Sequence, residues 1–461
     1  MACTPARAGA RLKAHSSGCA QTCAYGDPSY VRLADLLAAA RSWTYPRGVP
    51  EYCQLTSCAR SAVLEGAPPK LRPLQTVGCM RRSDHGTGSR QTAKADLRRA
   101  RVQWQDTTVT AVTVPRGRGS DFAALAREIK QAGLLDRRRG FYLVRIALNL
   151  AVLAAGCVAF VIIGDSWWQL LLAAFFAAVF THLSFIGHDA GHKQIFRTRR
   201  ANDLMGYLHG GLVGLSYDWW VGKHNRHHAN PNHEDDDPDL DLPILAFTRD
   251  QGLRSTGFAR WTIKYQAYLF FPLLLAEGLN LHWNAIRHVW QARGNRGSDR
   301  GTPTLEAVLL ILHVVIYLTA VFIVLSPLTG LVFIAVHQGL WGVYMGCSFA
   351  PNHKGMPTLG EGHQLDFLRK QVLTSRNVRG GRYVDFLLGG LNYQIEHHLF
   401  PSMPRPNLRR AQALVEDFCV RHKIDYTQCG LLRSYAHVLR HLHAIGAPLR
   451  RPTPAPADAL T

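Results

Sequence analysis

Three histidine-rich stretches decide how this sequence folds: HDAGH at residues 188–192, HNRHH at 224–228 and QIEHH at 394–398. Residues three and four apart lie on one face of a helix, so each stretch gathers imidazole or amide groups on one side. Neutral imidazoles from three such faces are typical of a transition-metal site and not of a site for hard cations. The three stretches therefore predict a metal centre built from distant parts of the chain.

The number of ligands favours two metal ions. A single zinc ion takes about four ligands, and the stretches contain seven histidines, namely His188, His192, His224, His227, His228, His397 and His398. Gln394 stands where an eighth imidazole is expected. It is a candidate to ligate weakly through its oxygen or to orient a metal-bound water. His353, in the sequence APNHKG at 350–355, is a further candidate ligand.

Other polar residues allow two interpretations. The acidic run Glu234, Asp235, Asp236, Asp237, Asp239 and Asp241 is either a solvated loop or a source of carboxylates that accept hydrogen bonds from metal-bound imidazoles. Asp189 and Glu396 are candidates for the same role. Four histidines stand singly in apolar stretches and are expected to be hydrogen-bonded interior residues: His182, His209, His313 and His337.

Four apolar runs predict membrane spans. Hydrophobic residues make up 47% of the 461 residues and charged residues only 18%. The runs cover residues 141–163, 167–186, 305–325 and 331–350, and a membrane helix needs about 20 residues. Turns at 164–165 and 327–330 pair them into two helical hairpins. Residues 205–220 and 265–283 are apolar but interrupted by Gly, His, Asp or Pro, which predicts interfacial or re-entrant segments.

The charges beside the first hairpin orient it. Arg137, Arg138 and Arg139 precede it, and Lys193, Arg197, Arg199 and Arg200 follow it, which places both ends in the cytoplasm by the positive-inside rule. The expected fold is an all-α polytopic membrane protein. Four transmembrane helices form two hairpins, and a cytoplasmic helical cap holds the di-metal site.

Both ends of the sequence differ from this central region. Residues 1–119 contain 18 Lys and Arg but only 7 Asp and Glu, a large part of the net charge of +21. We expect residues 1–117 to form a disordered basic segment, apart from a short helix near 30–43, that is solvated or contacts anionic lipid. No nucleic-acid motif accompanies the charge, and the six cysteines before residue 80 form no convincing zinc pattern. A capped helix is predicted to begin after Ser120. Residues 446–461 are expected to be a disordered Pro-rich tail.

The region from about residue 120 to 443 resembles the membrane fatty acid desaturase family. The resemblance rests on three boxes of the forms H-x3-H, H-x2-H-H and Q-x2-H-H, and on the flanking sequences FIGHDAGH at 185–192 and LNYQIEHHLFPSMP at 391–404. It implies a desaturase domain over residues 118–445 and a cofactor of two iron ions. It also implies dioxygen as co-substrate and a cis double bond introduced into a fatty acyl chain carried by CoA or by a lipid.

The third box is similar to that of the front-end branch and its bacterial relatives, which implies a bacterial plasma membrane with the site on the cytoplasmic face. Front-end members often carry a fused cytochrome b5 domain marked by His-Pro-Gly-Gly, and that motif is absent here. The difference implies a separate electron donor, such as ferredoxin or cytochrome b5 with its reductase. It also puts front-end regiochemistry in doubt.

Two other functions remain open from the sequence. A histidine-box membrane hydroxylase would use the same ligands and differ in the fate of the substrate radical. A membrane metal transporter would need ligating residues near the middle of the bilayer, whereas these clusters follow the ends of the predicted spans. Iron content and a changed fatty acid profile distinguish the three.

Overall fold

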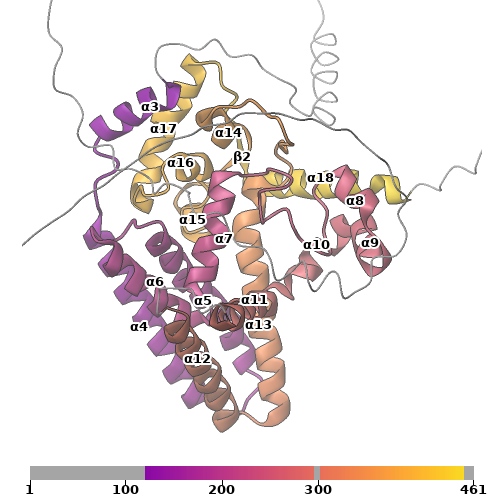
Figure 1. Cartoon of the computed structure of the whole chain (residues 1–461). Helices are drawn as coiled ribbons and strands as arrows, with labels where there is room; N and C mark the ends of the chain where they lie inside the picture. The colour runs from indigo at the N-terminus through magenta and orange to yellow at the C-terminus, as the bar shows by residue number, and fades with distance from the viewer. Residues whose placement is uncertain (1–119, 295–301, 451–461) are drawn as a thin grey trace, which may run out of the picture. The chain divides into compact units, whose positions relative to one another are not determined.

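The computed structural model describes residues 120–294 and 302–450 (Figure 1). The sequence-based expectations for residues 1–117, for the short helix near 30–43 and for the end of the tail fall outside this part of the chain. Helices dominate the described residues, as predicted. The exception is one pair of three-residue parallel strands, β1 (Asn377–Arg379) and β2 (Gln428–Gly430).

Four helices are long and apolar enough to cross a membrane: α4 (Arg139–Ile163), α5 (Gln169–Gly191), α12 (Thr302–Val324) and α13 (Pro327–His353). They coincide with the four predicted apolar runs. Many of their Leu, Ile and Val side chains face outward. Ile162 and Ile323, for example, are 78% and 77% exposed. Two helices are longer than expected, because α5 continues to Gly191 and α13 to His353. His353 is therefore the last residue of α13, whereas the predicted span ended at residue 350 and left His353 beyond it.

The two interrupted apolar segments form bent helix pairs. The first is α6 (Arg199–Val213) with α7 (Tyr217–Ala229), and the second is α10 (Gln266–Leu274) with α11 (Glu277–Gly294). Gly214 ends α6 at φ 73°, a left-handed conformation that glycine adopts without strain. The Nδ1 of His282 lies 2.9 Å from the carbonyl oxygen of Gly214. The side chain of His282 on α11 thus forms a hydrogen bond with a backbone carbonyl left free at the corner between α6 and α7. In an apolar environment every backbone polar group needs such a partner.

The corner between α10 and α11 packs closely against α13. A Cβ atom at Gly342 would lie 2.5 Å from both the backbone nitrogen of Gly278 and the carbonyl oxygen of Leu274. Only glycine leaves room for this approach. The contact matters for the site because α13 ends at His353.

The remaining helices surround the histidine stretches. One core is shared by α3 (Asp121–Gln131), α14 (Phe367–Leu373), α16 (Gln394–Leu399) and α17 (Arg405–Arg421). Ser120 caps α3 as predicted, since its hydroxyl oxygen accepts from the backbone N–H of Ala123 at 3.2 Å. The other elements are α8 (Arg249–Arg254), α9 (Gly257–Lys264), α15 (Gly381–Leu387) and α18 (Leu431–Arg450). Because α18 continues to Arg450, residues 446–450 of the expected disordered tail are helical.

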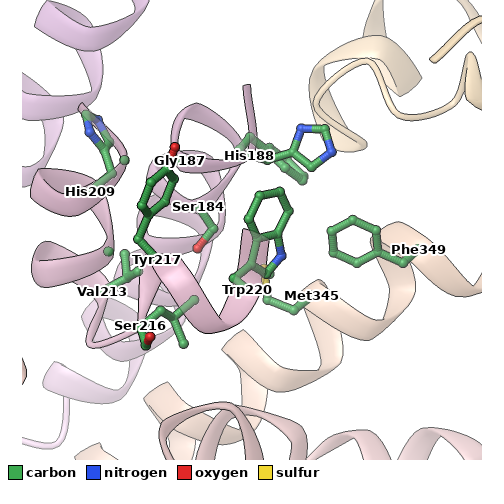
Figure 2. Close-up of a pocket in the computed structure, with 14 residues that line it drawn as sticks. Ser184, Gly187, His188, His209, Val213, Ser216, Tyr217, Trp220, Met345 and Phe349 are labelled. Carbon is green, nitrogen blue, oxygen red and sulfur yellow. The ribbon is translucent and has the colours of Figure 1, made fainter. Parts of the chain in front are cut away.

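A pocket lies between α5, α6, α7 and α13, next to His188 (Figure 2). Most of its wall is apolar and comes from Phe185, Val213, Leu215, Trp220, Met345 and Phe349. The ring centroid of Trp220 is 5.3 Å from that of His188. The pocket therefore connects an apolar interior to the first histidine stretch.

We predict that Gly342→Ala destabilises the protein, because the new methyl group would overlap backbone atoms of Gly278 and Leu274. Overpacking of this kind costs about 1–3 kcal/mol. Thermal unfolding of the detergent-solubilised protein measures the loss. Gly140→Ala is the matched control, since no atom lies within 4 Å of a Cβ built there. Equal melting temperatures for both variants would contradict the packing described here.

Candidate metal centre

The three histidine stretches and His353 converge on two neighbouring groups of buried imidazoles. His188, His192, His224 and His397 form the first group, and His227, His353 and His398 form the second. Within each group, one ring nitrogen per residue lies within 4.8 Å of the others. The structure thus brings together side chains that are up to 210 positions apart in the sequence, between His188 and His398.

The division of the histidines into two groups does not match their division into three stretches of sequence. His224 and His227, one helical turn apart on α7, belong to different groups, and so do the adjacent His397 and His398 on α16. His228 lies between the groups. Its Nε2 is 3.1 Å from Nε2 of His224, and its ring stacks on His398 with centroids 4.2 Å apart. The sequence predicted that the side chains of each stretch converge on one point. In the structure, the second and third stretches each contribute histidines to both groups.

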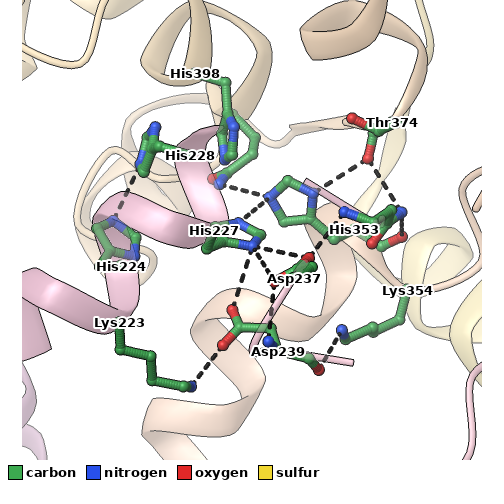
Figure 3. Close-up of polar contacts among 12 residues, drawn as sticks. Lys223, His224, His227, His228, Asp237, Asp239, His353, Lys354, Thr374 and His398 are labelled. Carbon is green, nitrogen blue, oxygen red and sulfur yellow. Dashed lines mark hydrogen bonds and ion pairs between the residues drawn. The ribbon is translucent and has the colours of Figure 1, made fainter. Parts of the chain in front are cut away.

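Hydrogen bonds fix the tautomers of two facing imidazoles (Figure 3). Nδ1 of His227 lies 2.9 Å from the Asp237 carboxylate, and Nδ1 of His353 lies 3.1 Å from the carbonyl oxygen of Thr374. Both acceptors lack hydrogens, so each Nδ1 carries the proton and each Nε2 presents a lone pair. These two Nε2 atoms are 3.3 Å apart. Two lone pairs at this distance repel each other. The amide N–H of Gln394 donates to the Nε2 of His353 and offsets part of this repulsion, and a bound cation would be attracted to both nitrogens.

Several ring nitrogens in the groups are buried without any protein partner. They include Nε2 of His188, His192 and His398 and both nitrogens of His397. A buried polar atom without a partner costs about 1–3 kcal/mol. Burial is also the main reason that the pKa of His224, His228, His397 and His398 lies well below its usual value. Burial therefore favours the neutral form of these four imidazoles, which can donate a lone pair. The residues of the two groups thus fit a pair of transition-metal ions.

Two carboxylates hold imidazoles as the sequence suggested. Asp189 lies 3.1 Å from Nδ1 of His188 and pairs with Arg405 at 2.6 Å. Asp237 binds His227 and is itself held by the backbone N–H groups of Asn232 and Asp239 at 2.8 and 2.9 Å. A carboxylate in this position orients a ligating imidazole and increases its basicity.

The other residues of the acidic run differ from one another: some are held by contacts near the site, and others are exposed as a solvated loop would be. Asp239 forms an ion pair with Lys223 at 2.5 Å. Burial alone would raise the pKa of Asp239, but Lys223, His227 and Lys354 outweigh it and lower that pKa. Asp235 is exposed and behaves as the solvated-loop interpretation expects.

Glu396 does not have the role expected from its position in the third stretch. Its carboxylate accepts hydrogen bonds from Asn377 and Tyr426, each at 2.7 Å, and orients no imidazole. Burial raises its pKa to about 7 despite these two donors. The helical register explains the difference, because Glu396 and the adjacent His397 project from the helix about 100° apart. It ties α16 to β1.

Gln394 lies beside the second group. Its Nε2 lies 2.9 Å from Nε2 of His353, and its Oε1 accepts a hydrogen bond from Asn352 at 3.2 Å. The side chain is only 2% exposed. Gln394 therefore contacts a candidate ligand directly.

Three residues of the site were missed by the sequence analysis. Asn232 holds the end of α13 through the carbonyl oxygen of His353 at 3.0 Å. Gln371 on α14 contacts His398, and Arg405 on α17 contacts Asp189. None of them lies in a histidine stretch, and their spacing carries no signal. Only the tertiary fold brings them to the site.

Comparison with known proteins agrees with this geometry. The family model described as "Fatty acid desaturase" matches residues 165–430, which is more than half of the chain. The chain belongs to the membrane fatty acid desaturase family. It is 30% identical to the acyl-lipid (9-3)-desaturase of Physcomitrium patens over 70% of this chain and 62% of that protein. It is 30% identical to a Delta(8)-fatty-acid desaturase of Euglena gracilis over 73% of this chain and 80% of that protein.

A third relative is the Delta(6)-fatty-acid desaturase fat-3 of Caenorhabditis elegans, with 29% identity over 70% of this chain and 74% of that protein. The matched region thus spans about three fifths to four fifths of these desaturases. Membership in the desaturase family makes the chain an oxidoreductase. Together with the four apolar helices it indicates an integral membrane protein.

We predict that Asp237→Asn weakens metal binding by about 10- to 100-fold, the usual effect of losing such a partner. The amide keeps the shape of the carboxylate but loses the charge that holds the Nδ1 proton of His227. Metal content after a chelator challenge measures the effect. Asp235→Asn, an exposed residue of the same acidic run, is the control. Full metal retention in the Asp237 variant would show that the carboxylate is dispensable.

Proposed function

We propose that this protein introduces a cis double bond into a fatty acyl chain at a di-iron centre, using dioxygen and two external electrons. The observation that carries the proposal is the convergence of buried imidazoles from all three histidine stretches and His353 on two neighbouring groups, in one of which the Nε2 atoms of His227 and His353 lie 3.3 Å apart. In the net reaction, two neighbouring methylene groups each lose one hydrogen. Dioxygen takes up these two hydrogens, two electrons and two protons to give two water molecules.

The proposed ligands are eight histidines, divided between the two groups with His228 between them. The full set is His188, His192, His224, His227, His228, His353, His397 and His398. The iron ions, when bound, would supply the oxidising power that protein side chains lack for attack on an unactivated methylene group. Asp189 and Asp237 keep the imidazoles of His188 and His227 in the tautomer that leaves Nε2 free. Gln394 is proposed to act as a hydrogen-bonding partner of His353 or of bound water, since its amide nitrogen faces His353 and its oxygen faces Asn352.

The pocket beside His188 is the proposed site for the short part of the acyl chain that reaches the metal centre. Trp220, Met345 and Phe349 line it with apolar surface, as Figure 2 shows. Such a wall attracts a hydrocarbon chain and excludes water, which protects the reaction from side products. The same wall holds the chain next to a candidate ligand of the first group. CoA and a membrane lipid remain the proposed carriers.

The proposed topology has two transmembrane hairpins, α4 with α5 and α12 with α13, and a cytoplasmic helical cap that holds the centre. The arginines at 137–139, and Lys193 with the arginines that follow it, support a cytoplasmic location for the same helix ends. We propose a desaturase domain over residues 118–445 and a separate electron donor, ferredoxin or cytochrome b5 with its reductase. A bacterial plasma membrane stays a prediction, since the three relatives above come from eukaryotes.

We predict that a host expressing the chain accumulates a fatty acid with one additional double bond. Gas chromatography with mass spectrometry of its fatty acid methyl esters measures the product. The names of two relatives refer to positions 6 and 8, so we propose a double bond near the carboxyl end. His397→Ala, which removes a proposed ligand, should abolish the product at equal expression. A hydroxylated product would indicate a hydroxylase, and altered metal uptake with unchanged lipids a transporter.

We predict that Gln394→Ala reduces turnover by about 10- to 100-fold, in line with the loss of other partners of metal ligands, while the protein stays folded. Gln394→His places an imidazole at the same point and should retain part of the activity if the position ligates. Rates per iron-loaded enzyme, with iron content measured in parallel, test both variants. An alanine variant with the normal rate and full iron would make Gln394 a bystander.

A further inference from the structure

Gln371 has no place in the chemistry proposed so far, yet it joins two histidine stretches. Its side chain is fully buried on α14. Its Nε2 donates to the backbone carbonyl of His228 at 2.9 Å, and its Oε1 lies 3.0 Å from Nδ1 of His398. One amide thus connects the end of α7 to the ring of a candidate ligand on α16.

The orientation of this amide follows from its partners. A backbone carbonyl only accepts hydrogen bonds, so the nitrogen of the amide must face His228. The oxygen must then face His398, whose Nδ1 therefore carries the proton. The other nitrogen, Nε2, is left as a buried lone pair without a protein partner. Gln371 consequently keeps His398 in the tautomer that a metal ligand needs.

The helix that carries Gln371 is held firmly. Leu368 and Val372 on the same helix are buried in the core that contains Ile395 and Leu399 of α16. Arg369 pairs with Asp121 of α3 at 3.0 Å. The position of Gln371 relative to α16 is therefore fixed by packing on one side and by an ion pair on the other.

The chemistry of the partner is also distinctive. His188 and His227 have carboxylate partners, whereas His398 has a neutral amide. A carboxylate increases the basicity of a ligating imidazole more than a neutral acceptor does. His398 is thus oriented without an added negative charge.

We propose that Gln371 is a positioning residue of the desaturase centre, which acts through His398 to retain the metal ion of the second group. The proposal rests on the function proposed above, because it assumes that the His227, His353 and His398 group binds iron. It goes further by assigning a role to a residue outside the histidine stretches.

The test compares three variants of the full-length purified protein, loaded with Fe²⁺ and then challenged with a chelator. Gln371→Leu removes both polar ends of the side chain and should weaken retention of one iron by about 10- to 100-fold. Gln371→Glu keeps an oxygen that can accept from His398 and, as a protonated carboxyl group in this buried position, can still donate to the carbonyl of His228, so it should retain the iron. Gln266→Leu is the matched control, since Gln266 is also fully buried and its amide bonds to backbone atoms of Ala246 and Leu442.

Iron content and the Mössbauer spectrum are measured alongside thermal unfolding. The proposal expects both leucine variants to lose stability, but only Gln371→Leu to lose one iron and the signal of one site. Should that variant fail to fold, Gln371→Asn takes its place. Its amide is one methylene shorter, cannot reach both partners and should lose the same iron.

Two outcomes would overturn the proposal. One is full iron retention with an unchanged spectrum in the folded Leu or Asn variant. The other is equal iron loss in the Gln266 control, which would reduce Gln371 to a contributor to general stability. A wild-type protein that retains fewer than two irons would instead contradict the function on which the proposal rests, so the two failures are distinguishable.

Discussion

The arrangement of the interior depends on the repulsion between ring nitrogens that face each other. The Nε2 atoms of His227 and His353 lie 3.3 Å apart and both present lone pairs, because their Nδ1–H groups donate to Asp237 and to the carbonyl oxygen of Thr374. Burying so many imidazoles without partners is costly. The surrounding hydrogen bonds increase this cost, since they keep the rings from turning to find other partners. The fold thus gathers ring nitrogens whose lone pairs a bound cation would stabilise.

This constraint requires a rigid frame, which the apolar helices provide. The imidazoles come from the last turns of α5 and α13, from the bent α6–α7 pair and from the short α16. Close contact at Gly342 fixes the α10–α11 corner against α13, and His282 satisfies backbone at the Gly214 corner. Small residues and buried hydrogen bonds hold helices together where the hydrophobic effect is weak, as it is in lipid. The same contacts set the position of each ligand.

Much of this could be predicted from the sequence. Four apolar runs became four helices, because length and hydropathy are local properties. The histidines were identified because their spacing matches a helical face. The finer assignment failed where it depended on tertiary contacts. Glu396 faces Asn377 and Tyr426 because of the direction of one short helix, and Gln371 meets His398 only through packing. The sequence after residue 445 was expected to be disordered because it is rich in proline, but residues 446–450 form the last part of α18.

The division of the second and third stretches between the two groups has a consequence for the geometry of the centre. His224 with His227, and His397 with His398, place ligands of both groups on the same rigid backbone. A shift or rotation of α7 or of α16 would therefore move ring nitrogens of both groups at once. The geometry of one group cannot be adjusted along either helix without changing the other, so a substitution that tilts α7 or α16 should disturb both groups together.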